Sequence, residues 1–156
     1  MIKMSRLVIA LLVLASGCML GPLGVKFTAD IDGIPFKATF AVWNDGSPTS
    51  SITASEVNLR ELDAIKGVVI NVLGAFEEKT YTLGLQDLGN YAIYTDTAQD
   101  KVYVSQSGTL TITSKTDRLV GEFEMTLAGL DEGGGESTLE VTNGVFDLPS
   151  APDPEM

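Results

Sequence analysis

Apolar and polar residues alternate along most of the chain after residue 24, in short stretches separated by turn-forming residues. A period of two places one side of a strand in a core and the other side in solvent. Turn signals such as Asp32-Gly33 stand between these stretches, and Asp-Gly is among the strongest short-range signals for a hairpin. Repetition at roughly 8–12 residues predicts an all-β, antiparallel β-sandwich of about ten short strands.

Two hairpins are the clearest local predictions. The first pairs residues 25–32 with 34–43 around Asp32-Gly33, and the second pairs 91–95 with 101–106. The order of strands cannot be read from one sequence, so a closed lipocalin-like barrel is the alternative to the sandwich. Further strands are predicted at 52–59, 68–73, 80–85, 109–113, 120–127, 138–142 and 145–148.

The first residues have the pattern of an export signal rather than that of a strand of the folded domain. Lys3 and Arg6 precede an apolar run over 7–15, which is shorter than the roughly 20 residues of a membrane-spanning helix. A basic start, an apolar stretch and a small-residue exit are typical of a secretory signal peptide. The exit Ala15-Ser16-Gly17-Cys18 resembles the lipobox of bacterial lipoproteins.

That resemblance implies that residues 1–17 are removed and that Cys18 becomes an acylated first residue. Two or more acyl chains make a stable membrane anchor. Met19 follows the cysteine, and in the lipoproteins that the motif resembles this favours the outer membrane of a Gram-negative envelope. We expect a lipidated tether over 18–24, a β domain over 25–148 and a disordered tail over 149–156.

Three further segments resemble a set of uncharacterised secreted lipoproteins of unknown function. They are FTADIDGIPFKA at 27–38, the pair SGTLTITS and LVGEFEMT at 107–114 and 119–126, and VTNGVFDL at 141–148. The shared features belong to strands and turns. The resemblance therefore implies the fold and export, and it implies no catalytic residue or ligand.

Composition excludes several classes of function. The chain has 21 acidic and 10 basic residues and a net charge of −11, which becomes −13 when Lys3 and Arg6 leave. Phosphate neutralisation by such a chain is unfavourable, so we expect no nucleic-acid partner. The chain has no histidine and one cysteine, which excludes Ser-His-Asp catalysis, His-ligated metals and disulfides. We expect no cofactor, and a membrane contact through lipid alone.

The aromatic residues are the best candidates for binding. Exposed aromatic rings on a sheet can stack on sugars or peptides, whereas buried ones pack in the core. Tyr91, Tyr94 and Tyr103 fall on the second predicted hairpin and are the predicted binding residues, ahead of Trp43 and Tyr81.

Carboxylates offer a less specific signal. Asp30, Asp32 and Gly33 read DxDG, a fragment of a calcium loop, but Ala41 stands where an EF-hand loop needs glutamate. A hairpin turn explains the same residues, and we expect no metal there. Asp96 with Asp100, and the acidic loop 131–136, are further places where an ion could sit.

These observations favour a lipid-anchored, non-enzymatic envelope domain that binds an unknown protein or glycan partner or has a structural role. One alternative is a barrel that carries a small apolar ligand in a cavity lined by residues such as Phe40, Val69 and Phe123. Another is a carboxylate-dependent hydrolase, which needs two acids in one cleft.

Overall fold

The structure, a computed structural model, describes residues 24–58, 60–61, 64–86, 89–130 and 134–150. The predicted signal peptide, Cys18 and nearly all of the predicted tether lie outside these residues, as do residues 151–156 of the predicted tail. In the described part of the chain, no helix is long and apolar enough to span a membrane.

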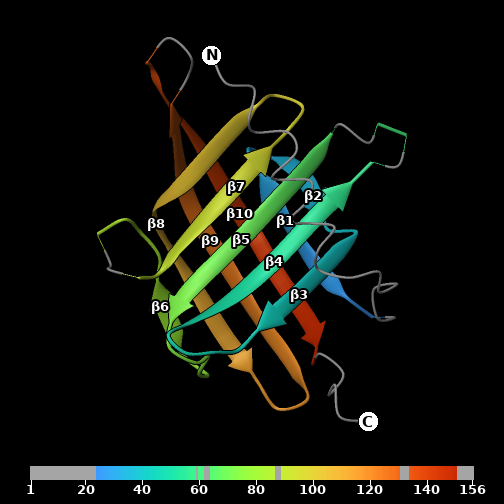
Figure 1. Ribbon diagram of the computed structural model, residues 1–156, viewed down its shortest axis with the longest axis vertical. Coiled ribbons are helices and arrows are strands. Elements are labelled where there is room, and N and C mark those ends of the chain that lie inside the picture. Colours follow the sequence, from blue (N-terminus) through green and yellow to red (C-terminus); the bar gives the residue numbers. More distant parts are fainter. Residues whose placement is uncertain (1–23, 59, 62–63, 87–88, 131–133, 151–156) are drawn as a thin grey trace.

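The described residues form one strongly curled antiparallel sheet, a half-barrel, so the all-β antiparallel prediction is confirmed (Figure 1). The strand order is β2-β1-β10-β9-β8-β7-β5-β4-β3, and β6 pairs with β8 beside this path. The ten strands are β1 (Lys26–Ile31), β2 (Ile34–Lys37), β3 (Phe40–Asn44), β4 (Thr49–Val57), β5 (Ile65–Leu73), β6 (Thr80–Thr82), β7 (Tyr91–Asp96), β8 (Lys101–Ser114), β9 (Arg118–Leu130) and β10 (Glu136–Pro149).

The first predicted hairpin forms only in part. Asp32 and Gly33 both have positive φ, 49° and 75°, as a type I′ turn requires, and β1 pairs with β2. The strand predicted over 34–43 is divided, because Ala38 N still donates to Phe27 O of β1 while Thr39 N donates to Ser55 O of β4. One continuous segment therefore supplies both outer strands of the sheet, β2 and β3.

The last three strands are longer than predicted. β8, β9 and β10 have 14, 13 and 14 residues, and they form the tallest part of the sheet in Figure 1. The predicted break at Asn143-Gly144 is a bulge within β10, since the residues on both sides pair with β9 and β1. Asn143 has a φ of 53°, and its Nδ2 donates to Asp30 Oδ2 at 2.9 Å.

The core lies on the inner face of the curled sheet. Phe27 is its centre, with ring centroids of Phe123, Phe36 and Phe146 at 5.0, 6.1 and 6.3 Å. Leu110 and Ile112 are the alternating apolar residues of the predicted strand 109–113, and they point inward as a period of two predicts. At the end of the sheet where β3 and β10 finish, Trp43 packs against the Phe76 ring, and its Nε1 donates to Pro149 O at 2.9 Å.

Candidate functional site

A pocket of about 240 Å³ opens at the end of the half-barrel where β1 turns into β2. Its walls come from strands far apart in the sequence, which the curl of the sheet brings together: β1, β2, β5, β7, β8 and β10. The lining is apolar on the β2 and β10 side and polar on the side of β5 and β7. The residues that line the pocket are Ile31, Asp32, Ile34, Pro35, Phe36, Lys66, Tyr94, Asp96, Gln99, Tyr103 and Leu139.

The structure places two of the three predicted binding tyrosines in this pocket. Tyr94 and Tyr103 are direct partners across the β7–β8 hairpin, with ring centroids 6.1 Å apart, and both are 5% exposed. Tyr91 lies on the same hairpin but points to the outer face, where it is 37% exposed. Residues three apart on a strand face opposite sides, so the three tyrosines do not share one surface.

The hydroxyl groups of the two inward-facing tyrosines are available for hydrogen bonding. Within the described residues, neither the Tyr94 nor the Tyr103 hydroxyl has a hydrogen-bond partner. Burial raises the pKa of Tyr94 above its ordinary value of 10.0, and the charges of Asp96 and Glu56 raise it further. The Tyr94 phenol therefore stays protonated and remains a donor at physiological pH.

Charged side chains of alternating sign cross the sheet at the same end. Glu56 on β4 is the register partner of Lys66 on β5, Lys66 that of Asp96 on β7, and Asp96 that of Lys101 on β8. All four lie two residues from inward-facing core positions, so they share the inner face. We call Glu56, Lys66, Asp96 and Lys101 the charge ladder.

Lys66 is the unusual member of the charge ladder. It faces Glu56 and Asp96 on its two neighbouring strands, and opposite charges at such positions commonly pair. Yet in the part of the chain that the structure describes, its ammonium has no ion-pair or hydrogen-bond partner. Of the described residues that line the pocket, Lys66 is also the one cation.

The two acids that line the pocket, Asp32 and Asp96, each stabilise a turn by accepting backbone hydrogen bonds. Asp96 Oδ1 accepts hydrogen bonds from Ala98 N and Gln99 N at 3.1 and 3.3 Å, which close the turn after β7. Asp32 Oδ1 accepts one from Glu140 N at 2.8 Å, which fixes the β1–β2 turn against β10. These hydrogen bonds give Asp32 and Asp96 a structural role in the two turns. In each carboxylate the bonds to the backbone use only Oδ1, so Oδ2 is not engaged by the backbone.

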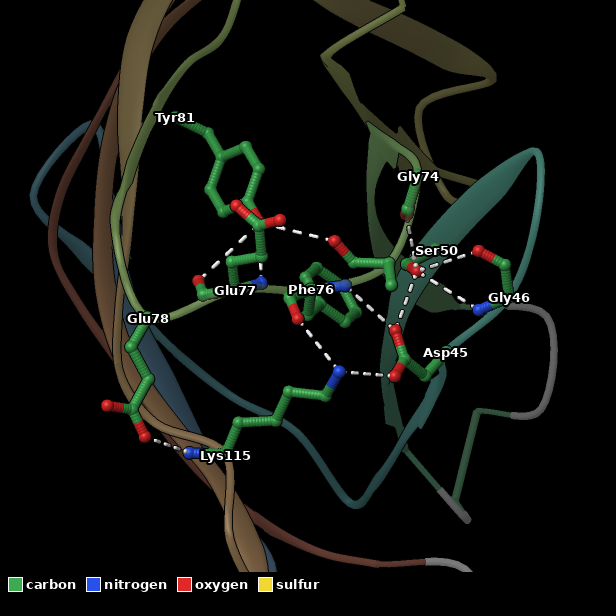
Figure 2. A network of polar contacts seen from close by, with 10 residues as sticks. Asp45, Gly46, Ser50, Gly74, Phe76, Glu77, Glu78, Tyr81 and Lys115 are labelled. Carbon is green, nitrogen blue, oxygen red and sulfur yellow. Dashed lines mark hydrogen bonds and ion pairs between the residues drawn. The ribbon is translucent and has the colours of Figure 1, made fainter.

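The opposite end of the half-barrel is closed by a polar network (Figure 2). Lys115 Nζ lies 2.5 Å from Asp45 Oδ2 and donates to Phe76 O at 2.8 Å. Asp45 Oδ1 accepts from Phe76 N at 2.8 Å and from Ser50 Oγ at 3.0 Å. Ser50 is fully buried, and its Oγ also lies 2.7 Å from Gly74 O. Every polar group named here has a partner in the chain.

The remaining residues that the sequence suggested as candidates do not come together at the pocket. Phe123 is part of the aromatic core, whereas Phe40 and Val69 lie on outward positions of β3 and β5, and none of the three lines the pocket. Asp30 is bonded to Asn143 on the outer face. Among the described residues, no group of three or more His, Cys, Asp or Glu could hold a metal ion.

Sequence reasoning missed Lys66 and Gln99 as site residues, and it considered Asp96 only as a place where an ion could sit together with Asp100. Lys66 stood in the stretch 60–66, whose local composition is that of a turn, and Asp96 began a predicted hairpin loop. The signal that could have found them is the pairing of strand ends. Lys66 lies near the start of β5 and Asp96 is the last residue of β7, and each is in phase with the inward-facing apolar residues of its strand. They therefore belong to the rim of the inner face.

Comparison with known proteins adds no relative. No family model matches the chain, and neither a curated protein nor a solved structure matches it.

Proposed function

We propose that this protein is a non-enzymatic binding protein of the bacterial envelope, anchored by lipid on Cys18, whose small ligand occupies the pocket. The anchor rests on the sequence alone, on the apolar run 7–15 and the lipobox-like Ala15-Ser16-Gly17-Cys18. Met19 after the cysteine supports the outer membrane as its location. The binding role rests on the structure of the pocket.

One observation carries the binding role: polar groups of the inner face lie at the pocket without partners from the fold. Buried donors and acceptors are almost always satisfied in proteins, because an unpaired one costs about 1–3 kcal/mol. Among the described residues, the buried side-chain polar atom that departs from this rule is Ser137 Oγ. The Tyr94 and Tyr103 hydroxyls and the Lys66 ammonium also have no partner in the described chain, but they lie at the open pocket, where solvent reaches them and a ligand can replace it. A ligand that supplies the missing partners explains all three.

We further propose that the curled sheet is a barrel rather than a sandwich. The chain segment that joins β2 to β3 bonds to β1 through Ala38 and to β4 through Thr39. Lys37 N donates to Glu56 Oε2 at 2.8 Å across the same opening, and β3 contacts β10 at the far end. Pro35, which has no N–H, leaves the exposed edge of β2 without a donor at that position. These features favour a closed wall around one core and one open mouth.

The lining favours a ligand with polar and apolar parts over a purely apolar one. Lys66, Asp96 and Gln99 would lose hydration against an apolar ligand without gaining partners. The absence of histidine from the sequence, and the turn-closing bonds of Asp32 and Asp96, support a binding role over hydrolysis.

The anchor is tested by the intact mass of the protein extracted from membranes. We expect a chain that starts at Cys18 and carries acyl groups, and a Cys18→Ser variant that leaves the membrane fraction. An unmodified Cys18, or a different first residue, would contradict the anchor.

The pocket is tested by a blocking substitution. Ile34 lines the mouth and is 61% exposed, so Ile34→Trp should narrow the pocket without disturbing the core. Val102→Trp is the control, because Val102 is 52% exposed on the outer face of β8. After equilibrium dialysis against an envelope extract, mass spectrometry should find small molecules enriched by the wild type and Val102→Trp but not by Ile34→Trp. Equal profiles for all three proteins would overturn the pocket as a binding site.

A further inference from the structure

We infer that the ligand is a small zwitterion, with an ammonium and a carboxylate on an aliphatic frame, such as a free amino acid or a short peptide. This inference rests on the proposed binding function of the pocket and specifies its ligand. It follows from the charges at the mouth, the unused hydroxyl groups, the apolar wall and the volume.

The carboxylate of such a ligand would meet Lys66. The side chain of Lys66 points to the inner face because residues 66, 68, 70 and 72 share one side of β5, and Val68, Ile70 and Val72 are buried core residues. The nearest acids on the neighbouring strands are bonded elsewhere, Glu56 Oε2 to Lys37 N and Asp96 Oδ1 to Ala98 N. Each of these acids keeps a second oxygen, but within the described residues neither forms an ion pair with Lys66, so its ammonium can pair with an anion from outside the fold.

The ammonium of the ligand would meet the acceptors on β7 and β8. An ammonium has three N–H donors and no acceptor. Asp96 is 5% exposed and its two backbone bonds use only Oδ1, so Oδ2 is available to such a donor. The Tyr94 and Tyr103 hydroxyls, beside Asp96 on the inner face, supply further acceptors.

The opposite wall accepts hydrocarbon. Ile34, Pro35 and Leu139 line the β2 and β10 side, and Ile34 is one of the most exposed large apolar residues of the described chain. The pocket has a volume of about 240 Å³, and it is open at its mouth. That volume suits a single amino acid, and the open mouth allows a second residue to extend outward.

Ligands with one sign of charge fit this arrangement less well. The protein carries a net charge of −11, and Asp32 and Asp96 line the pocket, so a simple anion is repelled. A simple cation is repelled by Lys66. A neutral sugar could hydrogen-bond to the hydroxyls, to Lys66 and to Asp96, but it would supply no charge opposite to either the ammonium or the carboxylate. A zwitterion satisfies both charges at once.

The test uses the isotope-labelled mature protein and a panel of zwitterions: the L and D forms of the common amino acids and the dipeptide Ala-Leu. We expect saturable chemical-shift changes at the backbone amides of Lys66, Asp96 and Gln99 for at least one member. Its N-acetyl and C-terminal amide derivatives, which each lack one charge, should bind about tenfold more weakly or worse.

Three variants separate charge recognition from a loss of folding. Lys66→Met should weaken the zwitterion about tenfold and leave its C-terminal amide derivative unchanged. Asp96→Asn keeps the acceptor that closes the turn, and it should weaken the zwitterion but not its N-acetyl derivative. Lys26→Met, at the far end of β1, is the matched control and should change neither affinity.

The outcomes distinguish the two proposals. If a neutral sugar or a fatty acid shifts the pocket amides while no zwitterion does, the ligand class is wrong and the binding pocket stands. If no compound shifts these amides and the blocking variant Ile34→Trp enriches the same molecules as the wild type, both proposals are wrong.

Discussion

The two ends of the half-barrel differ in how their polar side chains are paired. At the end that holds Asp45 the polar side chains bond to one another, whereas at the end that holds Lys66 this lysine faces described acids without pairing with them. Asp45, Ser50 and Lys115 complete one another's hydrogen bonds together with the backbone of Phe76 (Figure 2). At the pocket, Lys66 faces two carboxylates in register without pairing with either.

This difference suggests that one end of the sheet contributes to stability and the other end is suited to binding. Polar groups removed from water cost free energy unless they are paired, so the closed end contributes to stability by supplying every partner itself. The open end is reached by solvent, and its groups contribute little to the fold. It can therefore keep donors and acceptors in fixed positions on rigid strands for a ligand to complete.

The largest expected effect comes from removing Asp45. Asp45→Ala leaves Phe76 N without its acceptor and takes one of two acceptors from the Ser50 hydroxyl and the Lys115 ammonium, which keep Gly74 O and Phe76 O. The Asp45 side chain is only 28% exposed. We expect the free energy of unfolding to fall by about 3 kcal/mol, measured by urea denaturation. Asp45→Asn keeps the Oδ1 acceptor and should cost only about 1 kcal/mol. Equal losses in the two variants would show that the network does not stabilise the fold through these bonds.

The pH dependence of this loss has a defined sign. Burial alone would raise the pKa of Asp45, but the hydrogen bonds from Lys115, Phe76 N and Ser50, with the charge of Lys115, lower it below the ordinary 3.8. A lowered pKa in the folded state stabilises the fold above the ordinary value and stops doing so as the pH falls through the folded-state value. The gap in stability between the wild type and Asp45→Asn should therefore be full at neutral pH and shrink below pH 3.8.

The same two regions show what local sequence can predict. The type I′ turn at Asp32-Gly33, the β7–β8 hairpin and the inward positions of Leu110 and Ile112 all follow from neighbouring residues, and the structure has each of them. The bend at Ala38 and Thr39 could not be predicted, because apolar residues continue through it. What divides that strand is the distant partner Ser55, to which Thr39 is bonded.

The pocket was beyond local prediction for a related reason. Lys66 and Asp96 are 30 positions apart in the numbering and become neighbours only through the register of β5 with β7. Tyr94 and Tyr103 were predicted as binding residues, but their position inside the curled sheet depends on its closure by distant strands. A sequence pattern shows which face a residue is on, and only the register shows which residues meet there.

A moderate effect is expected at Gly129, which is the register partner of the pocket residue Tyr103. A Cβ at this position would lie 2.7 Å from Cδ1 of Tyr103 and 3.0 Å from Val102 O. Gly129→Ala should therefore displace the Tyr103 ring, reduce the free energy of unfolding by about 2 kcal/mol and weaken ligand binding. The double variant Gly129→Ala with Tyr103→Leu should recover more than half of the lost stability in urea denaturation. No recovery would show that the backbone contact with Val102, and not the ring, sets the cost.

The smallest effects on stability should come from the pocket groups, where the comparison between the two ends is sharpest. Lys66→Met and Tyr94→Phe remove an ammonium and a hydroxyl that have no partner within the described residues, so each should change the free energy of unfolding by less than about 0.5 kcal/mol at neutral pH. A loss as large as that of Asp45→Ala would make these groups part of the fold and remove the distinction between the two ends.

Tyr94→Phe should separate from the wild type only in alkaline solution. Burial, and then the charges of Asp96 and Glu56, raise the pKa of Tyr94 in the folded state above 10.0. A raised pKa contributes stability that is full below the ordinary value and lost as the pH rises through the folded-state value, because ionisation then favours the unfolded chain. The wild type should therefore become less stable than Tyr94→Phe above about pH 10, as measured by urea denaturation across the alkaline range. Parallel curves for the two proteins would place the Tyr94 hydroxyl in water, outside the pocket that the proposed ligand must enter.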